Sequence, residues 1–222
     1  MVHAGGRAHG RENSKEAVLD SIEFNPDLIE LDIRRSKDDV LYCYHGFPAV
    51  PMFFLAHFFK YFSFATIRRW LHVNTLEEIL SAVKKPSAFY LDIKNDHLAR
   101  HLDNLCVQFP QHNFWLASYD PERIRRWKQS LNGRYVYVYN FSFWNFKKGL
   151  ERAKEIKLDA FKLFPWQCTP AHVEQMKQAG IAHIIHPLML SRTRYQKLID
   201  RFGSLLICVD DMRKPQEWFM GV

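Results

Sequence analysis

The sequence of 222 residues has few cysteines and no long apolar stretch. Its four cysteines (Cys43, Cys106, Cys168 and Cys208) stand far apart without Cys-x-x-Cys spacing, so neither a cysteine zinc site nor a dense disulfide framework is expected. The histidines show no His-x-His or His-Glu-x-x-His spacing, so a dedicated zinc site is not indicated either. The first residues lack the apolar core of a signal peptide, and if Met1 is the true start we expect a cytoplasmic protein.

The charge balance of the chain is basic. Lys and Arg number 31 against 24 Asp and Glu, a formal net charge of +7, which favours an anionic partner. The basic residues are dispersed, so we expect a small phosphorylated molecule and not a nucleic acid. The composition, 47% hydrophobic and 25% charged, is that of ordinary globular proteins, and the length suits one domain over residues 1–222. The oligomeric state is not indicated.

Short apolar runs alternate with helix-like segments over the whole chain. The strand-like runs cover residues 28–33, 40–44, 88–93, 113–117, 135–139, 160–163, 183–186 and 205–209. The helix-like segments cover residues 14–23, 75–84, 121–129, 144–156, 170–179 and 191–201, with Thr75 and Thr169 as expected N-caps. Strands alternating with crossover helices predict an α/β fold, and the number of strands favours a TIM-type (β/α)8 barrel over an open sheet.

The segment 51–67 interrupts this alternation, within an aromatic-rich insert at residues 46–72. It carries seven aromatic residues, with only His57 and Lys60 as strongly polar interruptions. It is too short and too interrupted for a transmembrane helix. Two interpretations stay open: a buried helix or insert beside the site, or a lipid-facing lid that brings the protein into peripheral contact with a membrane.

Two carboxylates stand two residues apart in the first strand-like run. In a strand, this spacing directs Glu30 and Asp32 to one face while Leu31 and its apolar neighbours point to the other. Two converging carboxylates repel each other unless a cation separates them. Taken alone, such a pair is more often structural, on an exposed strand face or in a helical stretch with solvated acids, than part of a metal site.

Two further runs add partners to this pair. His45 follows the run 40–44, and Asp92 and Lys94 stand two residues apart at the end of the run 88–93. Asp92 would add a third oxygen ligand, and Lys94 would hold an anion. Oxygen ligands without cysteine suit Mg²⁺ or Ca²⁺ rather than Zn²⁺.

The start of the chain carries a third group of polar residues. His3 is followed by Gly5 and Gly6, and Glu-Asn-Ser at residues 12–14 leads into the first helix. Closely spaced glycines let the backbone approach a ligand, and Asn13 or Ser14 can cap the helix. A lone histidine here would be an ordinary surface residue. The polar motifs that accompany His3 make it a catalytic candidate.

Together these motifs resemble the glycerophosphodiester phosphodiesterase family over essentially the whole chain. They are, in order, His3-x-Gly-Gly, Glu12-Asn13-Ser14, Glu30-Leu31-Asp32, His45-Gly46 and Asp92-Ile93-Lys94. The resemblance implies a TIM-type barrel with its site at the carboxyl ends of the strands. It also implies a divalent cation held by Glu30, Asp32 and Asp92, an acid/base pair of His3 and His45, and substrate binding by Arg7, Glu12 and Lys94.

Two positions depart from the family pattern. Ala4 stands where the family usually has an arginine, with Arg7 as a substitute, and Asp92 stands where the third metal ligand is usually Glu. Asp92 followed by Ile-Lys, and Tyr44-His45-Gly46, are similar to the sphingomyelinase D branch of the same superfamily. The substrate is therefore open between a water-soluble glycerophosphodiester and a lysolipid.

The implied reaction is hydrolysis of a phosphodiester. A cation and Lys94 would neutralise the phosphoryl oxygens, while His3 and His45 act as base and acid in an order that the sequence does not set. The nucleophile is either water or a neighbouring substrate hydroxyl that first gives a cyclic phosphate. The alternatives are a lysophospholipase D or sphingomyelinase D-like lipid phosphodiesterase and a catalytically silent barrel that binds a phosphorylated ligand.

Three polar residues lie at the ends of late strand-like runs, and the sequence alone does not assign their roles. We expect His186 to be a hydrogen-bonded wall residue rather than a catalytic one. Asp210 and Asp211 either close the barrel rim or contact a substrate hydroxyl.

Overall fold

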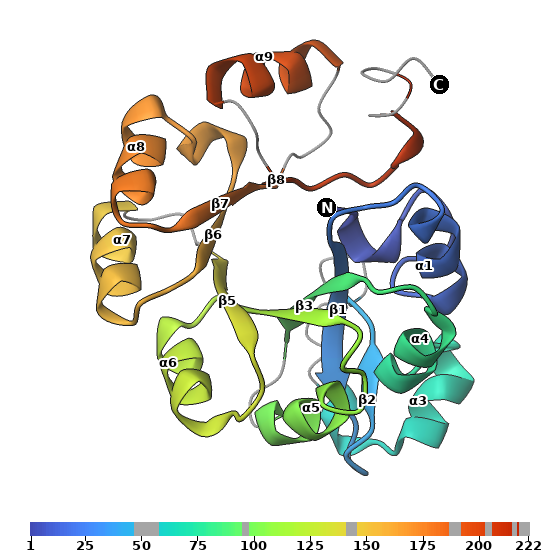
Figure 1. Ribbon diagram of the computed structural model, residues 1–222. Helices are drawn as coiled ribbons and strands as arrows, with labels where there is room; N and C mark the ends of the chain where they lie inside the picture. Colours follow the sequence, from blue (N-terminus) through green and yellow to red (C-terminus); the bar gives the residue numbers. More distant parts are fainter. Residues whose placement is uncertain are drawn as a thin grey trace.

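The computed structural model describes residues 1–46, 58–94, 98–140, 146–186, 192–202, 206–214 and 217. One curved sheet carries the strands in the order β2-β1-β3-β4-β5-β6-β7-β8 (Figure 1). Neighbouring strands are parallel except β1 and β2, which form a hairpin. The strands are β1 (Ile29–Arg35), β2 (Leu41–Cys43), β3 (Ala88–Ile93), β4 (Asn113–Ser118), β5 (Tyr135–Asn140), β6 (Ala160–Leu163), β7 (Ala182–Ile185) and β8 (Leu206–Ile207).

The amino-terminal segment closes this sheet into a barrel. Val2 forms parallel bridges to Ile29 of β1 and to Val209, which follows β8. The Val2 amide donates to the Leu28 carbonyl at 2.8 Å, and the His3 amide donates to the Val209 carbonyl at 2.7 Å. The expected TIM-type barrel is confirmed, but the run 40–44 is a hairpin partner of β1 rather than a parallel strand of the wall. The segment around Val2, too short to be recognised as a strand, takes that place.

Helices pack around the outside of the barrel (Figure 1). They are α1 (Lys15–Ile22), α3 (Phe64–Leu71), α4 (Leu76–Ala82), α5 (Ala99–Cys106), α6 (Pro121–Ser130), α7 (Phe146–Glu155), α8 (Pro170–Gln178) and α9 (Arg192–Phe202), with 3-10 turns η1 (His3–Gly5), η3 (Phe59–Tyr61) and η4 (Pro165–Gln167). Both expected threonine caps are present, since Thr75 accepts from the Glu78 amide at 3.0 Å and Thr169 from the His172 amide at 3.2 Å. Helix α5 was not expected. Its N-cap residue, Leu98, makes no side-chain cap hydrogen bond, so the sequence carries no capping signal for the start of this helix.

Alternation along the strands divides the core into two parts. In β1, the side chains of Ile29, Leu31 and Ile33 belong to the large cluster that the helices cover. Leu28 belongs to a second cluster, which lies inside the barrel with Tyr90 and Val138. The alternation places Glu30 and Asp32 on the same inner side as Leu28. The polar residues of β1 therefore stand above an apolar floor, toward the carboxyl ends of the strands.

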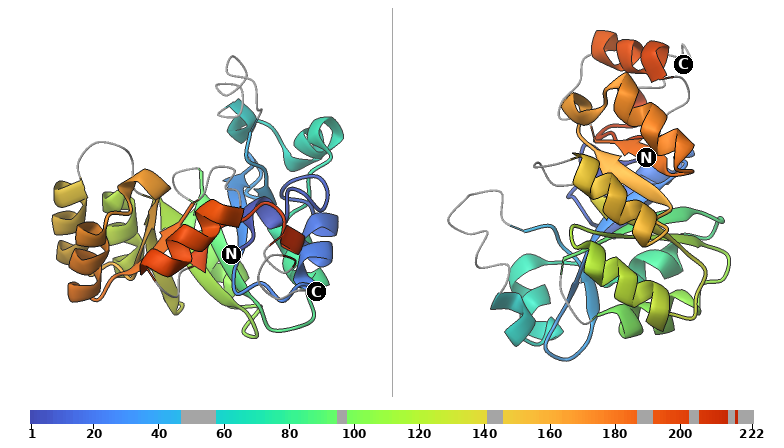
Figure 2. Two further views of the ribbon diagram at one scale, coloured as in Figure 1. Left: turned by 90° about the horizontal axis from the view of Figure 1, so that it is seen from above. Right: turned by 90° about the vertical axis from the view of Figure 1, so that its left-hand side faces the viewer.

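The described part of the aromatic-rich insert has two unlike sides. Residues 47–57 lie outside the described residues, so the expectation for 51–67 is addressed only from Phe58 onward. Phe59 and Ile67 are buried and pack in a small cluster with Tyr42. On the other side Phe58, Tyr61 and Trp70 are exposed by 54%, 62% and 53%. Both η3 and α3 stand to one side of the barrel (Figure 2). Within the described part of the chain, no helix is long and apolar enough to cross a membrane.

Candidate active site

Three buried carboxylates lie inside the barrel on two adjacent strands. Glu30 and Asp32 belong to β1 and Asp92 belongs to β3, and the parallel register places Asp32 directly beside Asp92. Their side chains are 3%, 4% and 3% exposed, respectively. Buried charges of one sign require positive partners nearby. The structure thus brings together the three acidic residues that the sequence singles out.

Two lysine ammonium groups supply the positive charge. The Nζ of Lys94 bridges two carboxylates, 2.8 Å from Asp32 Oδ1 and 2.6 Å from Asp92 Oδ2. Lys162 reaches across the barrel from β6 and places its Nζ 2.5 Å from Glu30 Oε1. Burial opposes ionisation of Glu30, but the charges of Lys162 and His3 and the hydrogen bond from Lys162 together outweigh it and lower the pKa to about 2. Burial likewise opposes ionisation of Asp32, and the Lys94 charge lowers that pKa below its ordinary value.

Asp92 is the least satisfied of the three carboxylates. Burial and then the charge of Asp32 raise its pKa, although Lys94 acts in the opposite direction. Its Oδ1 is buried and has no hydrogen-bond partner among the described residues. A buried, unpaired oxygen beside two more carboxylates fits the donor chemistry of a hard divalent cation.

The same residues do not form a ready-made metal site. In the described ranges, no group of three His, Cys, Asp or Glu side chains is arranged to hold a metal ion. The carboxylates are held by ammonium groups instead, one on Glu30 and one between Asp32 and Asp92. The donor types fit Mg²⁺ or Ca²⁺, and a cation bound by all three carboxylates would compete with the ammonium groups for them.

Asn13 fixes Asp32 from the loop that precedes α1. Its Nδ2 donates to Asp32 Oδ2 at 2.8 Å, and its Oδ1 accepts from the Asp32 amide at 2.8 Å. Asn13 adopts a φ of 60°, a left-handed conformation that asparagine tolerates well. Ser14 is the residue that caps α1, accepting from the Ala17 amide at 3.1 Å. The Glu-Asn-Ser motif therefore contains one residue that positions Asp32 and one that begins the helix.

His3 lies between a carboxylate of the rim and a carboxylate of the interior. Its Nδ1 is 2.6 Å from Asp210 Oδ1, and its Nε2 is 3.6 Å from Glu30 Oε2. Burial lowers the pKa of His3, but the hydrogen bond to Asp210 and the charge of Glu30 outweigh it, so the pKa is raised. Asp210 thus holds one ring nitrogen and leaves the other facing the carboxylates.

The remaining late residues form the wall and the rim of the site. The ring of His186 lies edge-on to His3, with centroids 4.9 Å apart. Burial, with the charge of Lys162, lowers the pKa of His186 to about 3, so this ring is neutral at physiological pH. Its Nδ1 has no hydrogen-bond partner in the described ranges, so the hydrogen bond expected of this wall residue is missing there. Asp211 pairs with Arg213 at 2.9 Å at the rim.

His45 follows β2 and is exposed at the same end of the barrel as Asp32. The Tyr44 amide donates to the Asp32 carbonyl at 2.9 Å, which joins the turn to β1. Arg34 of β1 holds the turn by donating to the Tyr44 carbonyl at 2.9 Å and to the His45 carbonyl at 2.8 Å. After burial and Lys94, the charge of His45 is the next contribution to the pKa of Asp32, and it lowers that pKa.

Arg7 and Glu12 lie further out. The Nε of Arg7 is 3.4 Å from Glu12 Oε2, and the two side chains are 55% and 26% exposed. The hydrogen bond from His3 lowers the pKa of Asp210 most, and the charge of Arg7 adds to this effect. Arg7 and Glu12 therefore belong to the rim near Asp210, outside the buried group of carboxylates.

Sequence reasoning missed Lys162 and did not foresee the bond between Asp210 and His3. The signal for Lys162 is that it is the one charged residue of the apolar run 160–163. Its ammonium also lies 4.9 Å from the centre of the Tyr90 ring, and the Tyr90 hydroxyl donates to Asn140 Oδ1. The link to Asp210 depends on closure of the barrel, because the two residues stand at opposite ends of the chain.

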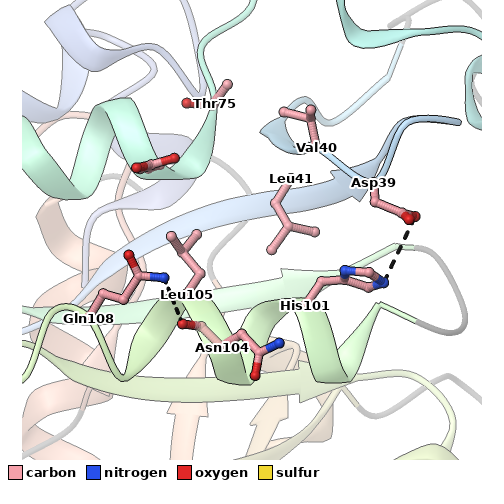
Figure 3. A pocket seen from close by; sticks show the side chains of 9 residues that line it. Asp39, Val40, Leu41, Thr75, His101, Asn104, Leu105 and Gln108 are labelled. Carbon is pink, nitrogen blue, oxygen red and sulfur yellow. Dashed lines mark hydrogen bonds and ion pairs between the residues drawn. The ribbon is translucent and has the colours of Figure 1, made fainter.

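A separate groove of about 300 Å³ lies outside the barrel, between α4, α5 and the hairpin of β1 and β2 (Figure 3). His101 points toward Asp39 there, with 3.8 Å between Nε2 and Oδ1, and Thr75 and Gln108 also line it. None of the eight sequence-predicted site residues lines this groove. The barrel interior, rather than this groove, is the candidate active site.

Comparison with known proteins adds independent evidence. The sequence matches the model of the family described as "Glycerophosphoryl diester phosphodiesterase family" over residues 3–191. No curated protein matches the sequence.

Several solved structures have the same fold. A Galdieria sulphuraria protein proposed to be a glycerophosphodiester phosphodiesterase has a TM-score of 0.81 at 19% identity, over 96% of this chain and 94% of that one. The glycerophosphodiester phosphodiesterase of Thermotoga maritima has a TM-score of 0.78 at 17% identity, covering 98% and 96%. An Oleispira antarctica phosphodiesterase in complex with the product sn-glycerol-3-phosphate has a TM-score of 0.76 at 14% identity, covering 99% and 96%. Because the family match spans most of the chain, including both histidines and the three carboxylates, the protein belongs to the glycerophosphoryl diester phosphodiesterase family.

Proposed function

We propose that the protein hydrolyses glycerophosphodiesters, as one domain over residues 1–222. Glu30, Asp32 and Asp92 would hold a divalent cation, Mg²⁺ or Ca²⁺, and His3 and His45 would act as acid and base. The observation that carries this proposal is the gathering of three buried carboxylates and two histidines at one end of a barrel. The family match supports the same reaction class.

The reaction is difficult because a phosphodiester repels nucleophiles with its own negative charge. A bound divalent cation neutralises part of that charge. The attacking oxygen forms a new bond to phosphorus while the bond from phosphorus to the leaving alcohol breaks. One histidine takes the proton of the nucleophile and the other donates a proton to the leaving oxygen, each transfer being worth about 10² to 10⁴-fold in rate. With water as nucleophile, the products are a phosphomonoester and an alcohol.

The protein's own charges suit these steps. The Lys94 ammonium is held in place by two carboxylates, and the side chain is 17% exposed, so it can face a phosphoryl oxygen that enters the site. Arg7 at the rim would add a second positive charge, with Glu12 as its partner. Because Asp210 binds Nδ1 of His3, Nε2 is the atom through which His3 would exchange a proton.

Hydrolysis of glycerophosphocholine tests the proposal. The parent protein, His45→Asn and His101→Asn would be assayed with Mg²⁺, with Ca²⁺ and with EDTA. His101 is a matched control, since it is a histidine in the separate groove. We expect cation-dependent turnover in the parent and in His101→Asn, and a loss of about 10²-fold or more in His45→Asn. Turnover that persists in EDTA, or an active His45→Asn variant, would contradict the assignment.

A lysolipid is the second candidate substrate, and the exposed aromatic side of η3 and α3 favours it. Phe58 and Tyr61 are more than half exposed, and Lys60 lies between them in the sequence. Aromatic rings flanked by positive charge suit the interface of an anionic membrane. Phe59 on the buried side packs edge-on against Tyr44, with ring centroids 6.1 Å apart, so this element adjoins the turn that carries His45.

Parallel assays on lysophosphatidylcholine and glycerophosphocholine separate the two substrates. The double variant Phe58→Ser/Tyr61→Ser would be compared with Val107→Ser, which replaces an equally exposed apolar residue at the C-terminal end of α5. If the aromatic side serves a lipid surface, the double variant loses lysolipid turnover and binding to anionic vesicles but keeps turnover of glycerophosphocholine. Equal effects on both substrates would leave the water-soluble diester as the substrate.

A further inference from the structure

Lys162 is a buried charged residue that the proposed reaction does not use. Its side chain is 8% exposed, and its Nζ makes an ion pair of 2.5 Å with Glu30 Oε1 from the opposite side of the barrel. The ring of Tyr90 lies 4.9 Å from the same ammonium and favours its positive charge. Burying an ammonium this deeply is costly unless a carboxylate compensates it, so Lys162 and Glu30 depend on each other.

The charges of the site are unbalanced without a ligand. Three carboxylates, Glu30, Asp32 and Asp92, face the two ammonium groups of Lys94 and Lys162, which leaves one negative charge. A divalent cation would change this to one positive charge, and a singly charged phosphodiester would then bring the sum to zero. The count reaches zero only if Lys162 stays charged and stays inside the site.

The two lysines differ in what they hold. Lys94 bridges Asp32 and Asp92, so it keeps one carboxylate when it loses the other. Within the described part of the chain, Lys162 pairs with one carboxylate only, and a cation bound by Glu30 would contest its position on Glu30 Oε1. The other Glu30 oxygen, Oε2, has weaker partners, the Cys208 thiol at 3.5 Å and His3 at 3.6 Å.

We propose that Lys162 is an exchangeable counter-cation, which neutralises Glu30 in the empty site and competes with the divalent cation for that carboxylate. The inference rests on the proposed function, because it assumes that Glu30 is a ligand of the cation. Lys162 acts through Glu30 and is therefore a positioning residue. It lowers the affinity for the cation, and in return it compensates the charge of Glu30 and keeps the interior folded when no cation is present.

Direct binding of Mn²⁺ tests the inference without an activity assay. Free Mn²⁺ would be measured by electron paramagnetic resonance during titration of the parent, Lys162→Met, Lys162→Arg and Lys128→Met. Lys128 is a matched control on the outside of the barrel, since it lies 3.8 Å from Asp159 and 5.1 Å from the centre of the Tyr137 ring. Removing the competing charge should tighten Mn²⁺ binding by about 10-fold to 100-fold in Lys162→Met, the usual size of coupling between two sites. Lys162→Arg and Lys128→Met should bind like the parent.

The outcomes separate this inference from the proposed function. If the parent binds Mn²⁺ and Lys162→Met binds it equally or more weakly, Lys162 only holds Glu30 in place and the inference is wrong. If Lys162→Met binds Mn²⁺ and the parent does not, the competition is supported while cation dependence of the parent fails. If neither protein binds Mn²⁺, both proposals fail.

Thermal unfolding covers the case in which Lys162→Met folds poorly. The variant leaves the Glu30 carboxylate buried without its ammonium, so its midpoint should fall when no cation is present. A ligand that binds only the native state raises the midpoint in proportion to its affinity. Saturating Mn²⁺ should therefore raise the midpoint of Lys162→Met more than that of the parent, or restore folding. A smaller or absent gain in the variant would overturn the inference.

Discussion

Buried carboxylates are neutralised in two different ways in this protein. Inside the barrel, Glu30 and its two neighbours are held chiefly by lysine ammonium groups. Outside it, the buried Asp103 of α5 is held by neutral donors alone among the hydrogen bonds described for it: the Asn132 and Gly133 amides, each at 3.1 Å, and the Tyr135 hydroxyl at 2.6 Å. Both arrangements keep a carboxylate ionised, since the pKa values of Glu30 and Asp103 are lowered despite burial.

The difference lies in what can replace the partner. An ammonium at the end of a flexible side chain can yield its place to a metal ion or turn toward a phosphate. Backbone amides can leave Asp103 only if the loop before β5 unfolds. The first arrangement therefore suits binding and the second suits stability, and substitutions in the two regions should affect different measurements.

The largest effect is expected for Asp92→Asn, on activity. Asp92 Oδ1 has no partner among the described residues, so its replacement by an amide costs few contacts, while one ligand of the proposed cation site is lost. Even residues that only orient metal ligands are worth about 10-fold to 100-fold, so kcat/KM should fall by about 100-fold or more. Urea unfolding should show a free energy within about 1 kcal/mol of the parent, because Lys94 keeps its ion pair with Asp32. If Asp92→Asn also lowered the free energy of unfolding by several kcal/mol, the distinction between the two regions would be lost.

The reverse pattern is expected for Asp103→Asn. Both carboxylate oxygens of Asp103 accept hydrogen bonds. In Asp103→Asn, an NH2 group replaces one of these oxygens and cannot accept, so at least one buried donor among the two amides and the Tyr135 hydroxyl loses its partner. This should lower the free energy of unfolding by about 1 to 3 kcal/mol, measured in urea. Activity per folded molecule should stay unchanged, because Asp103 lies outside the barrel interior. Loss of activity in fully folded Asp103→Asn would show that the outer region shapes the site after all.

The pH dependence of stability sharpens the same contrast. Burial raises the pKa of Asp103, but the bonds from Tyr135 and from two amides outweigh it, so the folded pKa lies below the ordinary value of about 3.9. A lowered folded pKa adds stability that is present above about pH 4 and is lost as the pH falls through the folded pKa. The stability difference between the parent and Asp103→Asn should therefore shrink below pH 4. A difference that stays constant down to pH 2 would mean that the charge of Asp103 contributes nothing.

Much of the fold could be predicted because helix caps and apolar runs are visible in the local sequence. Thr75 and Thr169 cap helices where their sequence positions indicate, and the apolar runs become the strands of the sheet. The exceptions are elements without local signals. Helix α5 begins without a side-chain cap, and the strand segment at Val2 exists only because β1 and the end of β8 offer it backbone partners on both sides.

The site shows the same division. The trio Glu30, Asp32 and Asp92 could be predicted from alternation, because spacing by two within strands fixes the face on which a side chain lies. The partners of these residues could not be predicted. Lys162 is 132 residues from Glu30 in the sequence, and Asp210 is 207 residues from His3. Which residues meet across a barrel depends on its closure and on side-chain length, and neither is a local property.

The smallest effect is expected at the cap of α4, which lies outside the barrel interior like Asp103. Thr75 accepts from the Glu78 amide, and the Glu78 side chain accepts from the Thr75 amide at 2.9 Å. Thr75→Ala removes one of these two bonds and should cost about 1 kcal/mol of unfolding free energy. Thr169→Ala, at the cap of α8, serves as its match and should cost a similar amount. Because both caps lie in the outer helical layer, turnover and Mn²⁺ affinity should equal those of the parent. A change in Mn²⁺ affinity in either variant would show that the charges of the interior are sensitive to the helices around them, and the two regions could no longer be treated as independent.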